Sequence, residues 1–177
     1  FCDVLFGRMN PSAKLPISFP RCEGQIPIYY AHKSTGRPLE SKGTVQFNQA
    51  HRSAYLDERN DPLFPFGYGL SYTRFEYTDL KIQNPSLKKH ETLRISAVVT
   101  NAGVRAGSEI VQLYVRDLVG MITRPVKEIK DFQKITLAAG ESSTVAFDLP
   151  MEKLAFLDAD LLPQIEPGEF LIWVGPN

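Results

Sequence analysis

The sequence lacks several features that mark whole classes of protein. Two of its 177 residues are cysteine, which is too few for a disulfide framework, and their spacing suits no metal site. No apolar run approaches the ~20 residues that an α-helix needs to span a bilayer. Acidic and basic residues balance to a formal net charge of zero, so no bulk attraction to nucleic acid or to an anionic membrane is indicated.

The two cysteines, Cys2 and Cys22, are interpreted as ordinary thiols. A bridge between them stays open as an alternative, because disulfide formation depends on a geometry that the sequence does not reveal. The chain also lacks an initiator methionine, a basic n-region and an apolar h-region. We therefore expect it to be a fragment or a processed piece of a longer protein.

Signatures of catalytic and metal sites are missing too. There is no nucleophile elbow, phosphate loop or dinucleotide fingerprint, and the three histidines are scattered. The densest acidic cluster combines Asp57 and Glu58 with Asp61. Neighbouring residues of an extended segment point to opposite sides, so we interpret this cluster as a solvated loop paired with Arg52 or Arg59.

A second acidic pair, Asp158 and Asp160, has the spacing of a turn. The surrounding stretch lacks the dense and regularly spaced oxygen ligands of a dedicated calcium site, so turn chemistry is favoured. We expect the chain to need no metal and no organic cofactor.

Proline is abundant in the first part of the chain. Residues 1–70 contain seven of the thirteen prolines and show little sustained periodicity. Leu15, Ile17 and Phe19 alternate with polar or proline residues, which predicts one short strand. One strand and long loops cannot bury a core of their own, so this part should wrap either the rest of the chain or a domain that is not present.

The second part, residues 71–177, shows period-two alternation. Turn signals containing glycine, proline or asparagine separate six or seven short strands. Their inward faces are predicted to carry Leu93, Ile95, Ala97 and Val99; Val111, Leu113 and Val115; Val145, Phe147 and Leu149; and Phe170, Ile172 and Val174. Phe75, Tyr77, Leu80 and Ile82 suggest the first strand, and Ile135 with Leu137 a middle one. This mainly β pattern predicts an antiparallel β-sandwich of the immunoglobulin or fibronectin III type, preceded by an irregular extended segment.

Four stretches carry a close resemblance to glycoside hydrolase family 3, the family of β-glucosidases and β-xylosidases. They are residues 3–7 (DVLFG), 10–20 (NPSAKLPISFP), 62–73 (PLFPFGYGLSYT) and 123–135 (TRPVKEIKDFQKI). Ala13 and Asp131 stand where glycine is usual in the family. The resemblance implies that residues 1–70 are the end of an α/β-sandwich domain with its connector, and that residues 71–177 are the fibronectin type III-like domain.

The resemblance also implies the chemistry of a longer parent enzyme. Family 3 enzymes resemble retaining glycosidases that use an aspartate nucleophile and a glutamate acid/base. The family's nucleophile lies in an N-terminal barrel and its acid/base earlier in the α/β-sandwich domain, so neither corresponds to a residue of this chain. We expect a scaffold part, inactive alone, of a β-glucosidase that cleaves terminal non-reducing β-linked sugars of a β-glucoside or oligosaccharide. Its partners would be the missing barrel and α/β-sandwich domains, and its location periplasmic or secreted.

One loop, residues 32–38, is retained as a candidate site by this analogy. Lys33, Thr35 and Arg37 could donate hydrogen bonds to sugar hydroxyls, because a loop in this position can lie near the mouth of the family's active site. The alternative is that Gly36 and Pro38 only shape a surface turn.

Two other functions stay open. The chain could be a free-standing fibronectin III-like module that binds carbohydrate or protein, although Trp173 is its only tryptophan. It could also serve in oligomerisation, because the aromatic stretch 64–77 would attract a second copy if it were uncovered. We expect the isolated chain to self-associate more readily than an intact enzyme.

Overall fold

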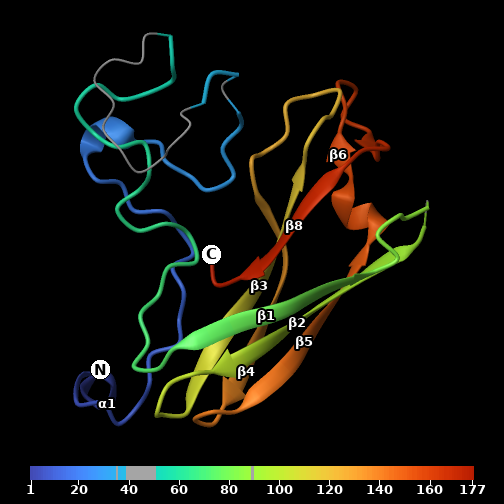
Figure 1. The fold of residues 1–177 in the computed structure, drawn as a ribbon. Helices are drawn as coiled ribbons and strands as arrows, with labels where there is room; N and C mark the ends of the chain where they lie inside the picture. Colours follow the sequence, from blue (N-terminus) through green and yellow to red (C-terminus); the bar gives the residue numbers. More distant parts are fainter. Residues whose placement is uncertain (35, 39–50, 89) are drawn as a thin grey trace.

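The computed structural model describes residues 1–34, 36–38, 51–88 and 90–177, and its strands build the predicted sandwich (Figure 1). One antiparallel sheet has the order β1-β2-β5 and the other has the order β4-β3-β8. The first consists of β1 (Phe75–Gln83), β2 (Thr92–Asn101) and β5 (Ser142–Pro150), and the second of β4 (Glu128–Leu137), β3 (Gly107–Asp117) and β8 (Phe170–Gly175). Every named strand within the described ranges thus starts at or after Phe75.

The remaining elements are short. They are α1 (Cys2–Leu5), the 3-10 turns η1 (Glu23–Gln25) and η2 (Met151–Leu154), and a small ladder of β6 (Phe156–Leu157) with β7 (Pro163–Gln164). Among the described residues no helix is both long enough and apolar enough to cross a membrane. Cys2 and Cys22 are both free and exposed, which confirms their interpretation as ordinary thiols.

The core lies between the two sheets and follows the predicted alternation. The inward side chains of β2, β3 and β5 are all buried, and Phe170, Ile172 and Val174 of β8 pack against them. Each fully buried aliphatic or aromatic side chain contributes about 1.5–3 kcal/mol to folding. The alternation therefore fixes which face of each strand turns inward, as expected from a period of two.

The first strand departs from simple alternation. Phe75 and Tyr77 pack against the core, but Leu80 is 48% exposed and Ile82 is 37% exposed. The pairing of β1 with β2 shifts register between Thr78 and Lys81. A bulge of this kind bends the strand, and the residues beyond it leave the core face.

The strand predicted around Leu15, Ile17 and Phe19 is wrong. Phe19 forms only an isolated antiparallel bridge with Phe64, and the flanking prolines lack the N–H groups that a longer ladder needs. The orientation is also reversed: Ile17 and Phe19 are exposed, whereas Ser18 is buried and accepts a hydrogen bond from the N–H of Phe66.

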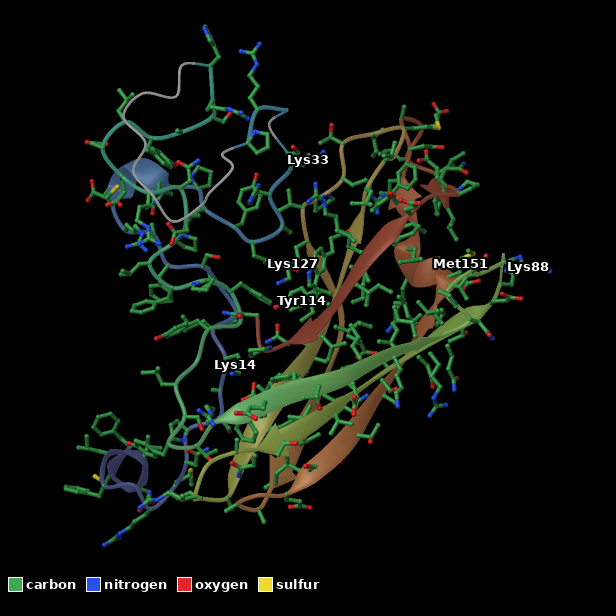
Figure 2. All side chains as sticks on the ribbon, viewed as in Figure 1. Lys14, Lys33, Lys88, Tyr114, Lys127 and Met151 are labelled. Carbon is green, nitrogen blue, oxygen red and sulfur yellow. The ribbon has the colours of Figure 1, made fainter. Side chains whose placement is uncertain are left out.

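The described residues before β1, which are 1–34, 36–38 and 51–74, are called here the extension. They run along one side of the sandwich and cover the outer face of β3 (Figures 1 and 2). Gln112 and Tyr114 on that face are buried, although the sequence pattern assigned burial only to the inner face. The ring of Tyr30 meets Tyr114 edge to face at 6.3 Å and stacks on Phe66 at 4.2 Å. The Lys127 ammonium lies 4.1 Å from the centre of the Tyr114 ring. The first part of the chain was expected to wrap either the rest of the chain or an absent domain. Its described residues pack on the sandwich of the same chain.

Candidate functional site

Two loops meet at one end of the sandwich. One is the β3–β4 loop, residues 118–127, and the other is the 32–38 loop of the extension, of which residues 32–34 and 36–38 are described (Figure 2). The backbone N–H of Val126 donates to the carbonyl of His32 at 2.9 Å. The β3–β4 loop of the sandwich therefore holds the extension's loop through a backbone hydrogen bond.

The structure places two of the three predicted sugar-contacting residues. Lys33 is exposed and forms an isolated antiparallel bridge with Pro125. Arg37 is exposed too, and its carbonyl accepts a hydrogen bond from the N–H of Ser53 at 3.0 Å. Thr35 lies outside the described residues. The 32–38 loop thus presents two cationic side chains to its surroundings from a backbone that is tied to the sandwich and to the extension.

Arg124 is the charged residue that the sequence analysis missed at this end. Its side chain is only 7% exposed, and Nη2 lies 3.6 Å from Oε2 of Glu128 at the start of β4. The guanidinium carbon lies 4.5 Å from the centre of the Phe156 ring, within cation–π range. The stretch TRP around Arg124 gave only a family match; it carried no signal that this arginine is buried.

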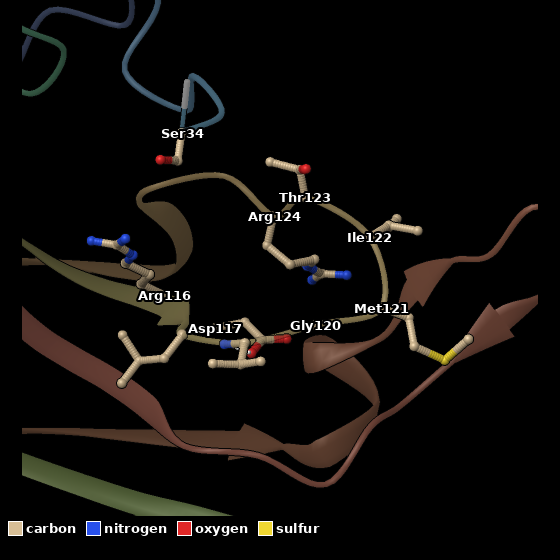
Figure 3. Close-up of a pocket in the computed structure, with 10 residues that line it drawn as sticks. Ser34, Arg116, Asp117, Gly120, Met121, Ile122, Thr123 and Arg124 are labelled. Carbon is tan, nitrogen blue, oxygen red and sulfur yellow. Dashed lines mark hydrogen bonds between the residues drawn. The ribbon is translucent and has the colours of Figure 1, made fainter. Parts of the chain in front are cut away.

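A cavity opens beside Arg124, inside the curve of the β3–β4 loop (Figure 3). Its volume is about 310 Å³. The lining includes both positive and negative side chains, and it reaches the extension through one serine. The polar lining residues are Ser34, Arg116, Asp117, Thr123 and Arg124.

Comparisons with known proteins find two domain families in the chain. Residues 1–72 match the glycosyl hydrolase family 3 C-terminal domain, and residues 109–177 match the fibronectin type III-like domain. A periplasmic beta-glucosidase of Salmonella typhimurium is 46% identical over 98% of this chain. The chain belongs to glycosyl hydrolase family 3. It corresponds to the C-terminal part of the family's members.

Two more relatives agree with this assignment. A beta-xylosidase of Formosa agariphila is 42% identical over 99% of the chain. The crystal structure of a beta-glucosidase from Listeria innocua in complex with gluconolactone superposes with a TM-score of 0.91 at 41% identity, over 98% of this chain. The family 3 chain spans about a fifth of these proteins: 22% of the Salmonella protein, 23% of the Formosa protein and 24% of the Listeria chain.

Asp61 and Asp158, from the two acidic groups noted in the sequence of the family 3 chain, have structural partners. Among the described residues no group of three or more His, Cys, Asp or Glu side chains could hold a metal ion. Oδ1 of Asp158 accepts hydrogen bonds from the N–H groups of Asp160 and Leu162, each at 2.9 Å. The bond from Leu162 is the main reason that the pKa of Asp158 is lowered. These contacts confirm the turn chemistry predicted for this pair.

In the acidic cluster of Asp57, Glu58 and Asp61, the carboxylate of Asp61 is held by ion pairs. Arg59 Nη2 lies 2.7 Å from its Oδ2 and Arg21 Nη2 lies 3.2 Å away, so pairing with Arg59 is confirmed and Arg21 is an additional partner. Arg52 donates to the carbonyl of Pro38. Burial raises the pKa of Asp61, but the hydrogen bonds from the two arginines outweigh it and leave the pKa below its usual value.

Asp61→Asn should lower the free energy of unfolding by about 1 kcal/mol at pH 7, because the partly exposed ion pairs are lost. A lowered pKa contributes stability above the unfolded value of 3.8 and loses it as pH falls through the folded pKa. The two proteins should therefore converge below pH 3.8. Urea denaturation at several pH values measures this, with Asp57→Asn on the exposed part of the loop as control. A difference that persists in acid would contradict the ion-pair account.

Proposed function

We propose that this chain is the C-terminal scaffold of a retaining β-glycosidase, a β-glucosidase in the first instance, that hydrolyses terminal non-reducing β-linked sugars. The observation that carries the proposal is a match over 98% of the chain to a beta-glucosidase, of which this part is only 22%. The bond-breaking carboxylates are then supplied by the barrel and α/β-sandwich domains of the longer enzyme. By the same relative, the enzyme works in the periplasm or outside the cell.

The scaffold role is supported by the surface of the extension. The extension contacts the sandwich through Tyr30 and Phe66, and it also exposes a large set of apolar side chains. That set comprises Phe1, Leu5, Phe6, Met9, Ile17, Phe19, Leu63, Leu70 and Tyr72, all of them exposed. Exposed apolar side chains in such numbers indicate a surface that another domain covers. We assign it to the missing domains, which leaves residues 1–70 as the end of the α/β-sandwich domain and residues 71–177 as the fibronectin-like domain.

The isolated 177-residue chain should leave aryl β-glucosides intact, whereas the full-length enzyme should hydrolyse them. The reason is that the proposed division of labour leaves no nucleophile or acid/base in this chain. Release of nitrophenol from p-nitrophenyl β-glucoside measures both proteins side by side. Turnover by a contaminant-free preparation of the chain would overturn the scaffold assignment.

Within the full enzyme, we assign Lys33, Thr35 and Arg37 to contacts with sugar hydroxyls at the mouth of the active site. The support is geometric: Lys33 and Arg37 are exposed, and the loop that carries them is held by the hydrogen bond between Val126 and His32. A backbone tied in this way limits the entropy that a donor loses when it meets its ligand.

Lys33→Ala or Arg37→Ala in the full-length enzyme should lower kcat/KM about tenfold, since each removes a hydrogen bond from a charged donor. Lys88→Ala is the matched control, because Lys88 is an exposed lysine on the β1–β2 loop and lies well apart from Lys33 (Figure 2). Steady-state kinetics on an aryl β-glucoside and a disaccharide measure the effect. Unchanged kcat and KM in both loop variants would remove the sugar-contact role and leave a shaped surface turn.

A further inference from the structure

A second cavity lies where the extension meets the outer face of the sandwich, and Lys14 marks its edge in Figure 2. Its volume is about 440 Å³. The extension provides one wall, and strands β3 and β4 provide the other. The apolar lining residues are Leu15, Pro16 and Phe66 from the extension and Ile110, Ile129 and Phe132 from the strands. This cavity, called here the Phe132 pocket, is therefore built by both halves of the chain.

Phe132 is the exposed aromatic residue of this lining. It lies directly opposite Gln112 in the pairing of β4 with β3, so the two side chains share the outer face of the sheet. Gln112 is buried, whereas Phe132 is 63% exposed. A large aromatic ring that stays in water forfeits the free energy of its burial. An exposed ring at the edge of an apolar cavity therefore indicates a surface that a partner covers.

The polar side chains of the pocket already have partners within the chain. The contacts are Lys14 with Glu109 at 2.8 Å, Lys130 with Glu128 at 3.6 Å, Asp131 with Lys153 at 3.4 Å, and Gln112 with the carbonyl of Pro176 at 3.0 Å. A sugar or an ion would compete with these contacts for its own hydrogen bonds. Apolar side chains of a protein surface need only the apolar wall, so the lining favours a protein partner.

The apolar surface continues from the pocket along the extension. Pro16 lines the pocket, and the next residue, Ile17, is exposed and belongs to the apolar set assigned above to the missing domains. The two halves that build the pocket superpose together, with a TM-score of 0.91, on a Listeria chain of which they form only 24%. The arrangement that creates the pocket is thus kept in a protein that has further domains to fill it.

Under the proposed function, residues 1–70 are the end of the α/β-sandwich domain, so the body of that domain must pack on the extension. The extension is also one wall of the pocket. We propose that the Phe132 pocket is the docking site of that body, and that apolar side chains of the α/β-sandwich domain cover Phe132 in the longer enzyme. This inference rests on the proposed function and adds the face of the fibronectin-like domain through which the two domains are joined.

The test is the reactivity of a thiol placed at position 132. Phe132→Cys and the control Arg94→Cys are made with both native cysteines replaced by serine, and maleimide labelling is followed by mass spectrometry. Both thiols should react readily in the 177-residue chain, because Phe132 and Arg94 are exposed there on different sheets. In the full-length enzyme the thiol at position 132 should react about tenfold or more slowly, since thiol reactivity depends on exposure. The control should keep its rate. Equal rates at position 132 in the two proteins would overturn the proposal.

A second measurement keeps an aromatic ring in place. Full-length enzyme with p-benzoylphenylalanine instead of Phe132 is irradiated, and the cross-linked peptide is identified by mass spectrometry. A cross-link to the α/β-sandwich body supports the proposal, whereas a cross-link to the barrel, or none, overturns it. Cross-linking that rises over about a hundredfold range of enzyme concentration would reveal a second copy and would also overturn it.

Hydrolysis of p-nitrophenyl β-glucoside by the same full-length protein separates this inference from the proposed function. An active enzyme with a reactive thiol at position 132 would refute the docking site alone. An inactive enzyme in which position 132 is protected and cross-links to the α/β-sandwich body would refute the proposed activity and leave the docking site intact.

Discussion

Lys14→Met should lower the free energy of unfolding by about 3–5 kcal/mol, because it strands a buried carboxylate. Nζ of Lys14 lies 2.8 Å from Oε1 of Glu109, and the two side chains are only 13% and 5% exposed. Lys14 belongs to the extension and Glu109 to β3, so this ion pair joins the two halves of the chain. Methionine keeps a long unbranched side chain but lacks the ammonium group, with its charge and its N–H donors.

Tyr77 is the second partner of Glu109, and it cannot replace the lysine. Its hydroxyl donates to Oε1 of Glu109 at 3.3 Å. Burial, and then the charge of Glu109, raises the pKa of Tyr77, so the hydroxyl stays protonated at every ordinary pH. One neutral donor compensates a buried carboxylate much less than an ammonium group does.

The double variant Lys14→Met with Glu109→Gln separates a lost attraction from a stranded charge. It should recover most of the stability, since replacing both members of a buried pair is often neutral. Lys134→Met on the exposed side of β4 is the control. Urea denaturation followed by tryptophan fluorescence measures all four proteins. A midpoint for Lys14→Met equal to that of Lys134→Met would show that the ion pair does not hold the extension in place.

The sandwich was predictable because its core obeys one rule, the alternation of inward and outward side chains. Val111, Leu113 and Val115 obey it, and the turn signals around Asn101 mark the correct strand end. The outer face of β3 was not predictable, since burial of Gln112 and Tyr114 depends on an extension that covers them from a distance in sequence. The strand prediction that included Ile17 and Phe19 was wrong for a related reason, since their apolar side chains face away from the sandwich.

The candidate site was predictable only in part. Family resemblance pointed to Lys33 and Arg37, and the structure adds what the sequence could not give, the support of their loop by the β3–β4 loop. Burial of Arg124 was not predictable, because most arginines are exposed. The tripeptide Thr-Arg-Pro also does not indicate that this arginine lies over Phe156. Nε of Arg124 and Oε1 of Glu166 are buried without a hydrogen-bond partner among the described residues, and they come from stretches that meet only in the folded chain.

The turn after β2 provides a second large effect, this time from a residue whose sequence signal was read only as a strand end. Asn101 is fully buried, and its Nδ2 donates to the carbonyls of Arg105 and Leu137 at 2.7 and 3.1 Å. Its Oδ1 accepts the N–H of Gly103 at 3.1 Å and the hydroxyl of Thr73 at 2.5 Å. One side chain thus joins the end of the extension, the turn and the last residue of β4.

Asn101→Asp should lower the free energy of unfolding by about 3–5 kcal/mol, because two carbonyls lose their donor and a charge is buried among acceptors. For a chain of this size that corresponds to a fall in Tm of about 10 °C. The loss should shrink as the pH is lowered, since protonation of the introduced carboxyl restores one donor and removes the charge. Asn84→Asp in the exposed turn after β1 is the matched control. Thermal unfolding at pH 7 and pH 4 decides the matter: equal Tm values for the two variants at pH 7 would show that the Asn101 network adds nothing to the fold.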